Sequence, residues 1–165
     1  MAYRAAGQPR GRVAAAHHRN FGKRLVKSPN LYFLDSGLRC YLMRIASPDD
    51  LYHHAMRGAV FETWVVSETP KHRFNRGLSA DLYFWRDKHG LEVGLVFQQG
   101  RQLQAVECKS GVTYSADRLG PARRWCQAVG PEAAPPVLVY GGASSHACSD
   151  HQVLSWQDLG LVTPS

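Results

Sequence analysis

The sequence lacks the signatures of several large protein classes. No apolar run approaches the ~20 residues of a membrane-spanning helix, so an integral membrane protein is excluded. The four cysteines, Cys40, Cys108, Cys126 and Cys148, form no CxxC pair, and no apolar secretory segment precedes them. We therefore expect reduced thiols in a cytoplasmic protein rather than a disulfide framework.

Nucleotide-binding and hydrolase motifs are also missing. The chain has no GxxxxGK[ST], the loop whose backbone N–H groups cradle nucleotide phosphates. It has neither a GxSxG nucleophile elbow nor an HExxH zinc helix. We expect no ATPase activity from this chain and no bound cofactor.

Acidic residues are absent from the first 27 positions, which hold seven Lys and Arg. The chain as a whole has 20 basic and 13 acidic residues and a formal charge of +7, so residues 28–165 carry 13 of each sign. We interpret residues 1–20 as a basic mobile arm. A solvated end is the favoured interpretation; contact with nucleic-acid phosphates and a transit peptide are the alternatives.

The remaining residues, 21–165, have the length and the hydrophobic pattern of one domain with its own core. Runs of β-prone residues alternate with helical periodicity, which predicts a mixed α/β fold with a central sheet flanked by helices. We expect Pro70 to end the helix that begins at Gly58, and a polar loop to follow over 73–80. The expected strands are 31–34, 82–86, 91–97, 103–109, 137–140 and 153–156, and the expected helices are 36–45, one beginning at Pro48, 58–68 and 115–129.

The residues with the clearest chemical potential are Glu107 and Lys109 at the end of a predicted strand. Side chains at i and i+2 of a strand share a face, so these two point together while Cys108 points into packing. A carboxylate can bind Mg²⁺, and a neighbouring lysine can orient water or stabilise the charge that develops on a phosphodiester. A solvated Glu–Lys pair is the commoner meaning of such a motif.

A second cluster, His146, Cys148 and His151, suggests a metal site at first sight. Its spacing matches no standard zinc pattern, and it lies in a stretch rich in Gly and Ser. Loop polarity is the better interpretation.

The order of the motifs resembles a known architecture. Glu62 on a helix precedes a hairpin whose second strand carries Glu92, and the next strand ends in the ExK pair. This order resembles the PD-(D/E)XK restriction-endonuclease-like core, and more narrowly the uncharacterised C-terminal domain of prokaryotic AAA-type ATPases. The resembling segments are residues 23–38, 58–64, 84–87, 91–93 and 106–110.

The resemblance implies a vestigial nuclease site. It assigns catalytic positions to Glu62, Glu92, Glu107 and Lys109, with Mg²⁺ held by Glu107 and Glu92 if the site is active. Family members resemble EVD or EID where this chain has Glu92-Val-Gly94, so the central aspartate ligand is missing. Glu92 is about 6–7 Å from that position along a strand, whereas a Mg²⁺ ligand lies at ~2.1 Å.

Three functions follow as hypotheses. The favoured one is a stand-alone or truncated C-terminal domain of an AAA-type ATPase, catalytically silent, that binds a protein such as an ATPase module, or nucleic acid through its basic arm. The first alternative is a metal-dependent nuclease, and the second is a non-functional fragment. The sequence leaves the oligomeric state open.

Overall fold

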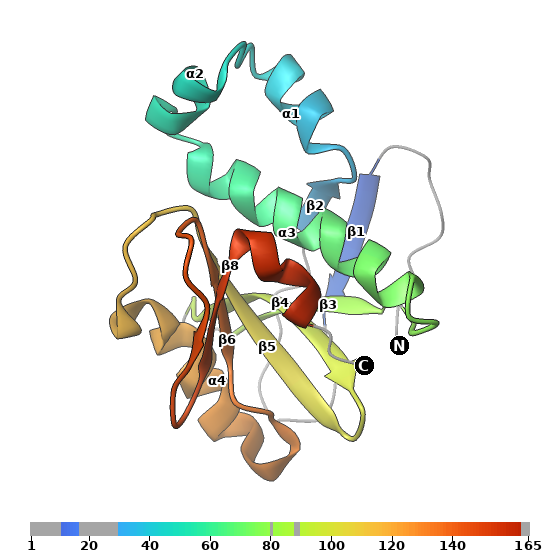
Figure 1. Ribbon diagram of the computed structural model, residues 1–165. Coiled ribbons are helices and arrows are strands. Elements are labelled where there is room, and N and C mark those ends of the chain that lie inside the picture. The colour runs from blue at the N-terminus through green and yellow to red at the C-terminus, as the bar shows by residue number, and fades with distance from the viewer. Residues whose placement is uncertain (1–10, 17–29, 80, 88–89, 163–165) are drawn as a thin grey trace.

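The computed structural model describes residues 11–16, 30–79, 81–87 and 90–162 (Figure 1). These residues form one eight-stranded mixed sheet with helices on both faces, which confirms the predicted mixed α/β class. The strands are β1 (Gly11–Ala16), β2 (Asn30–Phe33), β3 (Leu82–Arg86), β4 (Glu92–Gln99), β5 (Gln102–Lys109), β6 (Val137–Tyr140), β7 (His146–Ala147) and β8 (Gln152–Ser155). The α-helices are α1 (Ser36–Leu42), α2 (Pro48–His53), α3 (Arg57–Phe74) and α4 (Gly120–Val129), and the 3₁₀ segments are η1 (Ala116–Leu119), η2 (Gly130–Glu132) and η3 (Trp156–Val162).

The sheet joins an antiparallel half to a parallel half. Its strand order is β2-β1-β3-β4-β5-β6-β8-β7. β3, β4 and β5 pair antiparallel through short turns, whereas β5, β6 and β8 pair parallel. Parallel neighbours need a crossover, and α4 supplies the one between β5 and β6.

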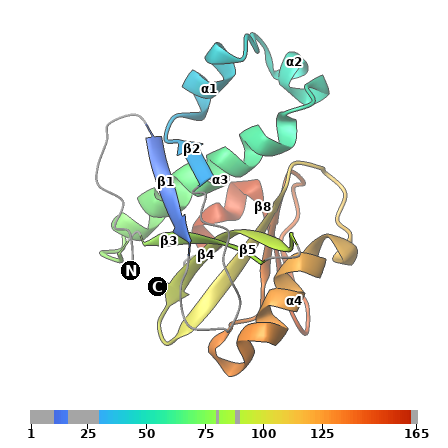
Figure 2. The ribbon, with the colours of Figure 1, turned by 180° about the vertical axis from the view of Figure 1, so that it is seen from behind.

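Two apolar clusters lie on the two faces of the sheet. α3 and η3 cover one face (Figure 1), and α4 covers the other, which Figure 2 shows from behind. Val65 and Leu159 belong to the cluster under α3 and η3, and Trp125 belongs to the cluster under α4. Strand residues of β4, β5, β6 and β8 alternate between the clusters, so these central strands are buried on both faces.

Local signals located most of these elements correctly. Asp35 accepts a hydrogen bond from the backbone N–H of Leu38 and caps α1, and Pro48 occupies the first turn of α2. Pro121 likewise lies in the first turn of α4. The predicted hairpin and the strands at 103–109 and 137–140 are confirmed within one or two residues at each end.

One strand lies where the sequence analysis expected a mobile arm without regular structure. β1 pairs antiparallel with β2 and parallel with β3. β1 therefore lies inside the sheet, between β2 at the edge and β3, and its run from Val13 to Ala16 is uncharged. The rest of the predicted arm, 1–10 and 17–20, lies outside the described residues.

The prediction that Pro70 ends the third helix is wrong. α3 continues to Phe74, and Pro70 is buried inside it. A proline ring removes one helical N–H, but tertiary packing of the second half of α3 outweighs this loss. The predicted polar loop therefore begins only after Phe74.

Arg73 is the main polar anchor of that second half. Its Nε donates to the carbonyl of Ser79 at 2.6 Å and its Nη2 to the carbonyl of Gln98 at 2.9 Å. The guanidinium carbon lies 4.7 Å from the centre of the Phe97 ring. Burial lowers the pKa of Arg73, which the nearby charge of Asp81 opposes.

Two further features depart from expectation. η3 was not predicted, and neither α1 nor α2 contains a buried residue. Both helices pack against α3, at the top of Figure 1. Within the described part of the chain, no helix has both the length and the apolar character needed to cross a bilayer.

Replacing Arg73 tests the anchor. Arg73→Met keeps an apolar stem but leaves the carbonyls of Ser79 and Gln98 without their donor, so the free energy of unfolding should fall by about 2–4 kcal/mol. Urea denaturation measures this change. Arg101→Met, at an exposed turn position, serves as control and should change it by less than ~0.5 kcal/mol. Equal effects at the two positions would contradict the anchoring role.

Candidate functional site

The predicted site residues gather where β4 and β5 separate. The paired residues of these strands run from Leu95 opposite Val106 to the turn at Gln99 and Gln102. Gly94 and Glu107 lie just beyond the last of these pairs. Glu62 approaches this fork from α3, and Lys109 ends β5.

The backbone of β4 bulges at Gly94. The register between β3 and β4 shifts by one residue at this point. Val93 packs in the cluster under α4, whereas Leu95 packs in the cluster under α3, so simple alternation fails between them. The bulge turns Gly94 toward α3, where Glu62 lies.

The carboxylate of Glu62 fills the space that a side chain at position 94 would need. A Cβ atom built on Gly94 would lie 2.6 Å from Glu62 Oε1, closer than such atoms approach in proteins. The Tyr32 hydroxyl donates to the same oxygen at 2.7 Å and holds the carboxylate there. Gly94 has no positive φ, so space rather than backbone conformation requires the glycine.

Glu92 is committed to an ion pair across the hairpin. Arg86 Nε donates to Glu92 Oε2 at 2.8 Å, and Arg86 Nη2 contacts the same oxygen. The two residues are directly opposite in the pairing of β3 and β4. This ion pair directs the Glu92 carboxylate across the hairpin toward Arg86, and Glu92 stands two residues before Gly94 on β4.

Glu107 and Lys109 point together, as predicted. Cys108 packs under α3, so by strand alternation its neighbours face the α4 side. Lys109 Nζ donates to Glu107 Oε1 at 2.8 Å. Glu107 is only 9% exposed, and its Oε2 is buried without a hydrogen-bond partner among the described residues.

This environment disfavours the charged form of Glu107. Burial raises the pKa of its carboxyl, the hydrogen bond and charge of Lys109 oppose the rise, and the charges of Glu62 and Glu92 add to it. The negative charges of Glu62 and Glu92 thus repel that of Glu107. Glu62 and Glu107 nevertheless approach the fork from different faces of the sheet.

Two arginines that the sequence analysis did not single out lie beside the end of β5. Arg57 Nε donates to Ser110 Oγ at 3.3 Å. The Arg118 guanidinium lies 3.3 Å from the position of a Cβ on Gly111. Together with Lys109 they form a basic rim, defined here as Arg57, Lys109 and Arg118. Because these residues come from α3, β5 and η1, no spacing in the sequence links them.

Among the described residues, no three His, Cys, Asp or Glu side chains converge closely enough to hold a metal ion. The carboxylates of Glu62, Glu92 and Glu107 are each bound by Tyr32, Arg86 or Lys109, and Oε2 of Glu107 is the buried carboxylate oxygen left without a partner in this part of the chain.

The second cluster considered from sequence is a polar network around the buried His151. The Tyr114 hydroxyl lies 2.7 Å from His151 Nε2, and Asp150 Oδ1 lies 2.6 Å from His151 Nδ1. Arg123 pairs with Asp150 at 3.0 Å. His146 packs edge-on against the Tyr114 ring. These partners fit a buried histidine satisfied by its neighbours.

The environment of Glu107 gives a pH prediction. Its carboxyl has a higher pKa in the folded protein than in the unfolded chain, so the folded state binds more protons and this group lowers stability as pH rises through that range. Glu107→Gln should therefore be more stable than the natural protein at pH 7, and the difference should disappear below about pH 4. Urea denaturation across this pH range measures it. A glutamine variant that is less stable at pH 7 would contradict the assignment.

The comparisons with known proteins identify a family without an assigned function. No curated protein and no solved structure matches the chain. Residues 57–159 match a family described as a domain of unknown function, DUF4143. That span contains Glu62, Glu92, Gly94, Glu107 and Lys109 and most of the sheet. The chain therefore belongs to the DUF4143 family.

Proposed function

We propose that this protein is a catalytically silent, restriction-endonuclease-like module that acts in the cytoplasm by binding nucleic acid. The observation that carries the proposal is the contact between Glu62 and Gly94: a carboxylate from α3 stands where a nuclease of the resembled type would project its central aspartate. The order of α3, the β3–β4 hairpin, β5 and α4 supports the likeness to the PD-(D/E)XK core.

Hydrolysis of a phosphodiester by this class of site needs convergent oxygen ligands. A bound metal would stabilise charge on the attacked phosphate. Here Glu62 accepts a hydrogen bond from Tyr32 and Glu92 one from Arg86, so each of these carboxylates already has a partner other than a metal ion. The site keeps the ExK pair of the resemblance without the geometry that would let it act.

Binding is supported by the basic rim. Arginine recognises phosphate through paired N–H donors, and lysine contributes a point charge. Arg57, Lys109 and Arg118 are each partly exposed around the end of β5. Because the rest of the domain is close to neutral, a local cluster of positive charge is needed to attract a polyanion.

The resemblance also indicates the kind of larger protein to which the module belongs. We propose that the module is the C-terminal domain of an AAA-type ATPase, so that an ATPase module is its partner in the larger assembly. The binding experiment below tests nucleic-acid binding against two alternatives. In one, a protein binds at the basic rim; in the other, the chain is a fragment with no function.

An active nuclease is the second candidate. The buried Oε2 of Glu107 without a partner favours it, since an orphaned carboxylate oxygen beside a lysine is suited to accept a cation or a proton. On this alternative Glu107 and Lys109 would be catalytic, and Glu62 and Glu92 would have to leave their present partners.

A cleavage experiment separates the two candidates. Plasmid and single-stranded DNA are incubated with Mg²⁺ or Mn²⁺ and the natural protein, Gly94→Asp, or Gly94→Asp with Tyr32→Phe, each with and without Lys109→Ala. Tyr32→Phe removes the hydroxyl that holds Glu62 against position 94, so the double variant gives the new aspartate room. Tyr32→Phe alone is the matched control, and circular dichroism checks each fold.

The proposal predicts no cleavage by the natural protein or by Tyr32→Phe. Cleavage that appears only with Gly94→Asp and is lost with Lys109→Ala would show an otherwise intact nuclease geometry and support the silent site. Cleavage by the natural protein that Lys109→Ala abolishes would establish the nuclease instead.

The same proteins serve for a binding measurement by fluorescence anisotropy with labelled DNA. The natural protein should bind with an affinity that falls as salt rises, and Arg57→Gln or Arg118→Gln should weaken binding several-fold. Arg101→Gln is the control. Equal weakening by all three variants, or no binding at low salt, would contradict the basic rim as the binding surface and favour a protein partner.

A further inference from the structure

The first two helices present an unburied surface. From residue 34 to residue 59 no residue is buried. Four large apolar side chains of this stretch are strongly exposed: Tyr41 at 78%, Leu42 at 60%, Tyr52 at 58% and Met56 at 44%. We call residues 38–56 the α1–α2 face. An exposed apolar area shared by two adjacent helices is characteristic of an interaction surface.

Polar tethers rather than an apolar core attach these helices to α3. Arg39 of α1 donates to the carbonyl of Ala59 at 2.9 Å and contacts the Thr63 hydroxyl. Arg57 donates to the carbonyl of Tyr52 at 3.1 Å, with its guanidinium over the Tyr52 ring. Hydrogen bonds thus attach the inner side of the helix pair to α3, while the large apolar side chains of the pair stay exposed.

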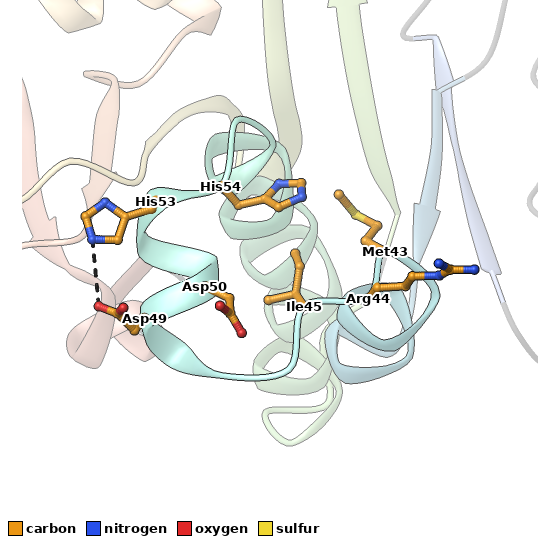
Figure 3. Close-up of a pocket in the computed structure, with 7 residues that line it drawn as sticks. All are labelled: Met43, Arg44, Ile45, Asp49, Asp50, His53 and His54. Atoms are coloured by element: carbon orange, nitrogen blue, oxygen red, sulfur yellow. Dashed lines mark ion pairs between the residues drawn. The ribbon is translucent and has the colours of Figure 1, made fainter.

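A pocket opens between α1 and α2 (Figure 3). Met43, Arg44 and Ile45 line it at the end of α1, and Asp49, Asp50, His53 and His54 line it on α2. Arg44 and Asp50 come from opposite sides of the pocket. Asp49 pairs with His53 at 3.7 Å, whereas Arg44 and Asp50 have no side-chain partner within the described ranges.

Arg44 occupies a position where glycine is the favoured residue. Its φ is +58°, and it is the first residue after the C-cap of α1. The N–H of Arg44 bonds to the carbonyl of Tyr41 and that of Ile45 to the carbonyl of Cys40, the Schellman arrangement in which glycine usually takes this place. Arg44 therefore holds a charged side chain at a position where any residue with a Cβ is strained.

We propose that the α1–α2 face is the contact of a symmetric dimer, and that its occupant is a second copy of this chain. Residues 34–59 contain three acidic residues and three arginines, so the face is electrically balanced in a chain of charge +7. In a two-fold contact the same patch meets itself. Arg44 of each copy then pairs with Asp50 of the other, and Leu42 and Tyr41 pack across the axis.

The charge balance distinguishes this occupant from others. A polyanion would favour a surface of positive charge, such as the basic rim, and an acidic or basic peptide would favour a surface of one sign. A patch whose Arg44 and Asp50 side chains have no partner in the described part of the chain is complementary to itself. The inference does not depend on the proposed function, because the residues of the proposed dimer contact, Tyr41, Leu42, Arg44 and Asp50, belong neither to the fork nor to the basic rim.

Sedimentation equilibrium on the 165-residue chain tests the proposal. The natural protein should form a dimer in the micromolar range. Arg44→Glu and Asp50→Arg should each raise the dimer dissociation constant at least about tenfold, because each places like charges opposite one another. The double variant restores opposite charges and should bring the constant back to within about threefold of the natural value. Arg101→Glu is the control for loss of one positive charge.

Arg44→Gly separates the dimer role from a structural one. Glycine relieves the positive φ, so the variant should be at least as stable as the natural chain in thermal unfolding of the dilute protein, yet it should dimerise more weakly. A natural chain that stays monomeric throughout the micromolar range would overturn the proposal, as would a double variant that does not recover. In the first case another molecule covers the face.

Discussion

The carboxylate of Glu62 rests against the backbone of β4 at Gly94, and much of the fork between β4 and β5 depends on this contact. The contact joins three elements: Glu62 lies on α3, Gly94 lies on β4, and the hydroxyl of Tyr32 on β2 donates a hydrogen bond to the Glu62 carboxylate. No side chain larger than hydrogen fits at position 94 while Glu62 keeps its place. The bulge in turn places Val93 and Leu95 under different helices, so the same contact sets how β4 divides its residues between the two clusters.

Most of the fold followed from local patterns, and the exceptions are interactions between distant residues. The cap at Asp35, the proline at the start of α2 and the alternation of β4 and β5 are local signals, and they located their elements well. Pro70 is also a local signal, but buried packing and the bonds of Arg73 to the residues after α3 and to β4 outweigh it.

The types of the site residues were predictable from the sequence, but their hydrogen-bond and ion-pair partners were not. The sequence predicted, through the family resemblance, an aspartate at the position of Gly94 and, through strand alternation, a shared face for Glu107 and Lys109. It could not show that Arg86 binds Glu92, that Tyr32 binds Glu62, or that Arg57 and Arg118 flank Ser110 and Gly111, since each contact joins separate elements. These contacts decide what the carboxylates can do: each predicted acid already has a partner.

The central claim is that Glu62 occupies the space of the missing side chain. A double-mutant cycle in urea denaturation measures it directly, with Gly94→Ala made in the natural protein and in Glu62→Ala. In a strand, alanine is more stable than glycine by roughly 0.5–1 kcal/mol. Without the Glu62 carboxylate, Gly94→Ala should therefore leave the free energy of unfolding unchanged or raise it. In the natural protein it should destabilise, with a coupling energy of about 1 kcal/mol or more. The same effect of Gly94→Ala in both backgrounds would contradict the account.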